Sequence, residues 1–193
     1  MRTRVIVITD GDDVARETVE GVAERFGLRT VSASAGNPTP LTGDEIARLA
    51  RRAEHDPVLV MVDDRGRPSK GAGESALEEL LTNPQIDVLG VVAVASHTRR
   101  AHGIRVDESV TADGEITRHP VDKDGEARAG ADVLIGDTVD VLNEVRAPFV
   151  VGVGDPGKMR GQDCTARHCP ITARAVEEIL RRAGVLPRER GRG

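Results

Sequence analysis

Two short runs of aliphatic residues constrain the fold of this chain more than any other feature. Val58–Val62 is continuously apolar, and Val88–Ala95 is apolar around a single glycine, Gly90. A strand with no polar face is expected where helices cover the sheet on both sides, as in parallel sheets. The chain is therefore predicted to be α/β, with a three-layer, mostly parallel, Rossmann-like sheet and helices on both faces.

Helical patterns separate the predicted strands. Apolar residues recur at helical spacing from Ala15 to Phe26, and Gly27 follows in the position of a helix C-terminal cap. Thr42–Glu45 has the pattern of a capping box before a second helix, and a third helix is expected to stop at Asn83-Pro84. The strands are predicted near residues 4–8, 28–35, 58–62, 88–95 and 149–153.

One segment departs from this alternation. Residues 103–130 contain short alternating stretches around two hairpin signals, Asp113-Gly114 and Lys123-Asp124-Gly125. They predict a short antiparallel β insertion.

After the insertion, the pattern predicts a helix carrying Val139, Leu142 and Val145, then the strand at 149–153 and a last helix that Gly184 ends. No Ser/Pro-rich linker divides the chain, so residues 1–186 are predicted to form a single α/β domain. Residues 187–193 are expected to be a disordered basic tail.

Composition excludes several classes of protein. The 193 residues carry 27 Lys and Arg against 32 Asp and Glu, a net charge of −5, with two Phe and no Trp or Tyr. A nucleic-acid partner is not expected, because basic surface and stacking aromatic residues are both lacking. No apolar stretch approaches the roughly 20 residues that a membrane span needs, and the N-terminus does not resemble a signal peptide. With only two cysteines, Cys164 and Cys169, a reducing cytoplasm is the expected location.

Acidic residues follow the predicted strands. Asp10 and Asp12 come after the first strand, Asp63 and Asp64 after the third, and Asp155 after the last. Ligands of open α/β sheets bind beyond the carboxyl ends of the strands, where these side chains should meet. Oxygen ligands suit Mg²⁺ or Ca²⁺, so Asp10, Asp63 and Asp155 are candidate metal ligands. The alternative is that each Asp caps a helix or turn.

Two glycine loops and one serine complete the candidate binding residues. Lys70, Gly71 and Gly73 precede a predicted helix, where backbone amides and the helix dipole favour a small anion. Gly154 and Lys158 lie in a segment that fits G-x-G-x-x-G. The segment lacks the βαβ continuation of a dinucleotide site, so it predicts an anion site at most. Ser96 follows the fourth strand at the same edge.

No catalytic group is evident. Ser96 and His97 are adjacent on an extended chain and point apart, and no Gly-x-Ser-x-Gly motif is present. His168 beside Cys169 is expected to lie in an ordinary loop before a helix. The catalytic residues, if the protein is an enzyme, are unknown from the sequence.

Several segments, taken in order, resemble a known family. They are Val7–Asp12, Ser32–Pro38, Asp56–Asp64, Gly71–Glu74, Val88–Ser96, Gly136–Asp140, Val151–Met159 and Pro170–Leu180. The chain is similar, from about residue 4 to residue 183, to the soluble form of stage V sporulation protein AE. A separate, membrane-embedded protein shares that name, and this hydrophilic sequence does not resemble it. The resemblance implies a role in endospore formation, in a set of proteins that move dipicolinic acid into the developing spore and release it in germination.

The resemblance implies no reaction. The leading hypothesis is therefore an accessory or binding component of the dipicolinic acid machinery, with membrane-associated spore proteins as partners. The alternative is a divalent-metal-dependent enzyme, or a protein that binds a small anion or nucleotide, using the acidic edge.

Overall fold

The sheet of the computed structural model confirms the predicted α/β class. The structure describes residues 2–66, 70–98 and 101–186. Within them, seven strands form one sheet in the order β2-β3-β1-β4-β7-β5-β6. The predicted tail at 187–193 lies outside the described residues.

Four parallel strands form the centre of the sheet. β1 (Thr3–Ile8) lies between β3 (Val58–Met61) and β4 (Ile86–Val94), and β7 (Val150–Val153) pairs with the other edge of β4. Every residue of β3 is fully buried. The uniformly apolar sequence of this strand thus reflects a position covered on both faces, as predicted.

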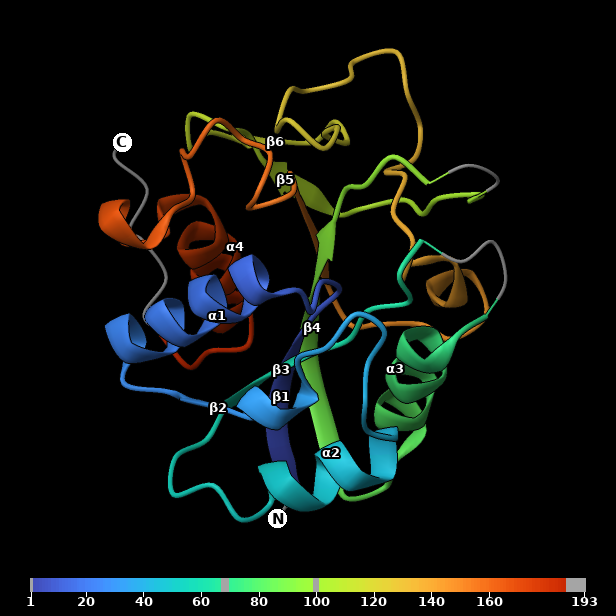
Figure 1. Cartoon of the computed structure of the whole chain (residues 1–193), viewed down its shortest axis with the longest axis vertical. Coiled ribbons are helices and arrows are strands. Elements are labelled where there is room, and N and C mark those ends of the chain that lie inside the picture. The colour runs from blue at the N-terminus through green and yellow to red at the C-terminus, as the bar shows by residue number, and fades with distance from the viewer. Residues whose placement is uncertain (1, 67–69, 99–100, 187–193) are drawn as a thin grey trace.

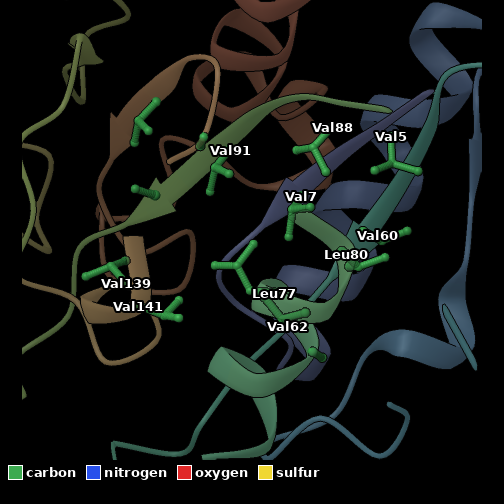
Figure 2. Packing of buried hydrophobic residues seen from close by; sticks show 14 of the residues in the cluster. Val5, Val7, Val60, Val62, Leu77, Leu80, Val88, Val91, Val139 and Val141 are labelled. Atoms are coloured by element: carbon green, nitrogen blue, oxygen red, sulfur yellow. The ribbon is translucent and has the colours of Figure 1, made fainter. Parts of the chain in front are cut away.

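Helices form the two outer layers (Figure 1). α1 (Asp13–Phe26) and α4 (Pro170–Arg182) pack on one face, where Val19, Val22 and Ile179 belong to one hydrophobic cluster. α2 (Gly43–Ala50) and α3 (Ala72–Thr82) cover the other face. Figure 2 shows this second cluster, in which valines of the sheet meet Leu77 and Leu80 of α3.

The predicted caps are present. Gly27 ends α1 with a left-handed φ of 64°, a conformation that glycine adopts without a steric penalty. Thr42 and Glu45 form a complete capping box at the start of α2. α3 ends at Thr82, and its C-cap Asn83 directly precedes Pro84. Local sequence therefore determines where these helices begin or end.

The insertion contains the predicted antiparallel pairs. β5 (Glu108–Val110) and β6 (Ile116–Thr117) form a hairpin around Asp113-Gly114, and Val121 bridges Ala127 around the second turn. β5 also pairs in parallel with β7, so the hairpin extends the main sheet.

Residues 28–35 form less strand than predicted. Only β2 (Arg29–Thr30) pairs with β3, and a 3₁₀ helix, η1 (Ser32–Ser34), follows it. The Ser34 hydroxyl donates to the Val31 carbonyl oxygen at 2.7 Å and accepts from the Met61 amide at 2.9 Å. The Ser34 hydroxyl therefore accepts the hydrogen bond of the Met61 amide, which the backbone of a longer β2 would otherwise accept.

The helix predicted around Val139, Leu142 and Val145 is also wrong. The segment forms a short 3₁₀ helix, η2 (Asp140–Asn143). The Val141 amide donates to Glu74 Oε1 at 2.8 Å, and Asp140 accepts from the amides of His102 and Gly103. These bonds attach η2 to the start of α3 and to the segment at His102.

Candidate functional site at the carboxyl ends of the strands

The chain topology brings the segments after β1 and β3 to one edge of the sheet. The helices that follow these neighbouring strands, α1 and α3, lie on opposite faces. Such a reversal opens a crevice at the carboxyl ends of the strands, the usual place for a ligand in open α/β sheets. Gly11 and Asp63 face each other there.

Asp63 is a buried carboxyl group held by two backbone amides. Its side chain, 3% exposed, accepts from the Gly11 amide at 3.2 Å and from the Arg65 amide at 2.8 Å. Burial is the main reason that its pKa rises to about 6, and the charges of Asp137 and Asp12 add to the effect. Asp63 therefore joins the loops after two adjacent strands and titrates unusually close to neutral pH.

Asp12 and Asp10 differ in role although they lie two residues apart. Asp12 is the N-cap of α1, and its Oδ1 accepts from the Ala15 amide at 2.8 Å. Asp10 has a longer contact of 3.4 Å from the Asp12 amide. The pKa of Asp10 rises well above its usual value, chiefly through burial and then through Asp12, Asp63 and Asp155. Asp10 thus lies within the electrostatic reach of both other predicted metal ligands.

Asp64 caps α3 from a distance. Its two carboxylate oxygens accept from the amides of Gly73 at 2.7 Å and Glu74 at 2.9 Å. A Cβ on Gly71 would lie 2.1 Å from Asp64 Oδ1, and one on Gly73 would lie 2.6 Å from the backbone of Asp63. The two glycines are therefore needed for close approach. An external anion at this helix start would have to displace Asp64.

Asp155 and Lys158 form a turn after β7. Asp155 Oδ1 accepts from the Gly157 amide at 2.8 Å, and its Oδ2 lies 3.6 Å from Lys158 Nζ. Gly154 is packed so closely that a Cβ would lie 2.7 Å from Met159 Sδ. These residues fold as a compact turn, and residues 158–164, directly after Gly157, form no helix.

Lys70 and Ser96 are directed elsewhere. Lys70 Nζ pairs with Glu78 Oε2 at 2.5 Å on the surface of α3. The Ser96 hydroxyl lies 2.8 Å from Thr98 Oγ1, and the Ser96 amide donates to the Ile135 carbonyl oxygen. In the described part of the chain, neither side chain forms a hydrogen bond or ion pair with Asp10 or Asp63.

The carboxylates of this edge do not form a ready-made metal centre. Among residues 2–66, 70–98 and 101–186, no group of three or more His, Cys, Asp or Glu side chains is placed to hold a metal ion. Asp12, Asp63 and Asp155 instead accept hydrogen bonds from backbone amides. Mg²⁺ or Ca²⁺ at Asp10, Asp63 and Asp155 stays a prediction.

The structure adds one acidic cavity that the sequence did not indicate. It measures about 500 Å³ and includes Glu74, Asp137, Asp140 and His102 in its lining. Glu74 is 5% exposed, and its pKa is raised by burial and then by Asp64 and Asp140. These residues come from segments more than 25 positions apart, so no local motif could have revealed the cavity.

The buried thiol is not poised for nucleophilic attack. Cys169 is fully buried, and burial is the main reason that its pKa rises to about 11. The thiolate is the reactive form, so this group is inert near neutral pH. Cys164 and Cys169 are both free thiols.

Together these features define a three-layer α/β protein with an acidic edge in the usual ligand-binding position of such sheets. The sequence matches the family model of stage V sporulation protein AE1 over residues 4–183, and the chain belongs to this family of sporulation proteins. No curated protein and no solved structure matches it. In the described residues, no helix is both long and apolar enough to cross a membrane.

Proposed function

We propose that this sporulation protein is a non-catalytic accessory component of the machinery that moves dipicolinic acid into the developing spore and releases it in germination. Membership of the stage V sporulation protein AE1 family supports the role in sporulation. We further propose that the protein acts in the spore-forming cell and that membrane-associated spore proteins are its partners.

One observation carries the non-catalytic part of the proposal. Asp12, Asp63, Asp64 and Asp155 each accept hydrogen bonds from backbone amides. A carboxylate that acts as a general base needs a lone pair directed at its substrate. The amide bonds use part of the acceptor capacity of each carboxylate and give it a structural role in the loops and helix starts of the edge, which supports the accessory role. Asp10 is the acidic residue of this edge with only a long amide contact.

A genetic experiment with a spore readout tests the proposal. In a spore-forming host that lacks its own copy, spores should contain less dipicolinic acid, and the wild-type gene should restore the content. Asp10→Asn should restore it equally well, because a non-catalytic component does not depend on proton transfer at this carboxyl group. Unchanged content in the deletion strain would contradict the accessory role. A null phenotype for a normally abundant Asp10→Asn protein would favour catalysis.

A specific observation favours a second candidate, a divalent-cation-dependent activity on a phosphate or another small anion. The Asp10 carboxyl group feels the charges of Asp63 and Asp155, which raise its pKa. A bound cation would relieve this repulsion.

Thermal unfolding with Mg²⁺ or Ca²⁺ tests this alternative. A cation that binds only the folded protein stabilises it by about 2.7 kcal/mol at a hundredfold excess over its Kd, which raises the melting temperature by several degrees. The double substitution Asp10→Asn, Asp63→Asn should erase the shift while the protein still folds. An unchanged wild-type melting temperature at millimolar cation would refute this candidate.

A further inference from the structure

A separate cavity of about 400 Å³ opens at the carboxyl end of β4. The residues after β4 form one wall, and the second hairpin turn of the insertion forms another. Its volume is within the range of about 300–1,000 Å³ that is typical of small-molecule sites. Asp10, Asp63 and Asp155 are not among its lining residues. We propose that this cavity binds a small organic acid, with carboxylate groups on an apolar body.

The hydroxyl groups of Ser96 and Thr98 provide the first argument. They lie 2.8 Å apart, so one O–H group donates to the other. The second O–H group then remains available as a donor, because no other side chain or carbonyl group of the described residues accepts a hydrogen bond from it. Both side chains line the cavity. This pair can therefore donate a hydrogen bond to a ligand oxygen.

The charged groups of the cavity also leave donors in excess. Lys123 Nζ contacts Asp124 Oδ2 at 2.7 Å, and Arg128 Nε contacts Asp122 Oδ2 at 3.3 Å. An ammonium group has three N–H donors and a guanidinium group has five, so most of their donors stay free.

The acidic partners have less capacity left. Asp122 Oδ1 already accepts from the amides of Asp124 and Glu126, at 3.0 and 3.1 Å. Asp124 accepts through Oδ2 alone, so it keeps acceptor sites on Oδ1. The two cations nevertheless retain more donors than the two carboxylates retain acceptor sites, and the cavity favours a ligand that brings its own acceptors. A carboxylate has this property, and it pairs well with a guanidinium group.

Apart from the imidazole of His97, the rest of the lining is apolar. Val121 is buried, and Val133 and Ile135 are half-buried side chains that line the same cavity. A ligand with an apolar body would remove this surface from water, at about 25 cal/mol per Å². The combination of apolar lining and donor excess therefore distinguishes an organic acid from an inorganic anion.

Amide chemical shifts of the wild-type protein, titrated with three probes, test the inference. Benzoate and dipicolinate carry carboxylates on a ring, and acetate has almost no apolar body. The ring acids should shift the amide signals of Ser96, Thr98 and Ile135, and acetate should bind at least tenfold more weakly. If neither ring acid moves these signals, or if acetate binds as tightly, the inference is overturned.

Two variants test whether the ring acids bind in this cavity or are attracted to positive charge anywhere on the insertion. Lys123→Gln combined with Arg128→Gln should weaken binding of the ring acids at least tenfold, which corresponds to about 1.4 kcal/mol. Arg118→Gln changes an exposed arginine of the same insertion, outside the cavity, and should alter affinity less than twofold. An equal loss in both variants would overturn the inference.

The inference goes beyond the accessory role and borrows only one probe, dipicolinate, from it. Failure of the two proposals can therefore be distinguished. Spores with normal dipicolinic acid content after gene deletion would contradict the accessory role but not binding in the cavity. If neither ring acid binds in the cavity, this inference is contradicted, but the expected effect of gene deletion on spores is not.

Discussion

Asp64 illustrates how one buried carboxylate can set the start of a helix nine residues away. Its oxygens accept hydrogen bonds from the Gly73 and Glu74 amides, which have no partner inside α3. The carboxylate reaches them only because Gly71 has no side chain.

Gly71→Ala should therefore destabilise the protein. The φ of Gly71 is −107°, which alanine adopts freely, so the effect is purely the 2.1 Å contact of the new Cβ with Asp64. Losing hydrogen bonds to a charged group should cost about 2–4 kcal/mol in the free energy of unfolding, measured by urea denaturation. Gly130→Ala is the matched control, since a Cβ there meets nothing within 4 Å. Equal stability of the two variants would exclude this account of the cap.

Asp10 should make stability depend on pH. Its pKa is raised in the folded state, so the folded protein holds this proton more tightly than the unfolded chain. The stabilisation from this proton is present below the ordinary aspartate pKa of about 4 and is lost as pH rises. Asp63, with a pKa of about 6, acts in the same direction.

Asp10→Asn should accordingly melt a few degrees above the wild type at pH 8, because it removes a destabilising buried charge. The difference in melting temperature should vanish near pH 4. There Asp10 of the folded wild type is protonated, so its side chain is neutral, as the asparagine side chain of the variant is. Asp113→Asn, at the exposed tip of the first hairpin, serves as the control and should show no such pH-dependent difference. A constant difference at every pH would contradict titration of Asp10 as its cause.

At this scale, the sequence predicted only part of the site. The apolar run before Asp63 and the glycines at the start of α3 predicted that Asp63, Asp64, Gly71 and Gly73 lie at one edge, and Asp64 does contact the Gly73 amide. That this edge binds a ligand stays a prediction. The hydrogen bonds of these residues join segments separated by up to 74 residues, as between the Asp64 amide and the Thr138 hydroxyl, and no local pattern indicates such contacts. Lys70 formed an ion pair on the helix surface instead, because Glu78 lies within its reach.

At the level of elements, the helices with apolar residues at helical spacing over several turns were predicted, whereas the short segments held by distant contacts were not. α1, α2, α3 and α4 all show helical periodicity and all four were predicted, although only α1 and α2 have a side-chain cap at the N-cap residue. The segment of η2, predicted as a longer helix, is held by a distant contact, the bond of the Val141 amide to Glu74, 67 residues away. A pattern of apolar residues cannot distinguish these two cases.

The N-terminus of α1 offers a test of a local cap. Asp12→Ala should lower the free energy of unfolding by about 1 kcal/mol, because the Ala15 amide loses its partner. Asp12→Asn should retain most of the stability, since an asparagine oxygen accepts the same bond. The two variants are compared by thermal unfolding. A large loss for Asp12→Asn would show that the charge of Asp12 matters beyond capping.

For the whole molecule, the sheet is the common base of two hydrophobic clusters, one under each helical layer. The sequence predicted this three-layer arrangement, because only a doubly covered sheet explains strands without a polar face. It did not predict the strand order, which depends on which segments meet in space.

Val60→Asp tests the arrangement directly. Val60 is 0% exposed in the middle of β3, and an unpaired carboxylate there would cost a large part of the 5–15 kcal/mol that typically stabilises a domain. The variant should be insoluble or should lack a cooperative thermal transition, whereas Val14→Asp, on the exposed side of α1, should melt normally. A soluble Val60→Asp protein with a sharp transition would rule out this architecture.

The position of β7 has a consequence for synthesis on the ribosome. β5 and β6 are made before β7, but β5 reaches β4 only through β7, which pairs with both. The sheet is therefore closed by a strand inserted into its interior after the hairpin has been translated. A chain truncated before Val150 would leave β4 and β5 each with an unpaired edge, and exposed strand edges readily pair with other chains. Nascent or prematurely terminated chains of this protein should thus depend on chaperones to avoid aggregation.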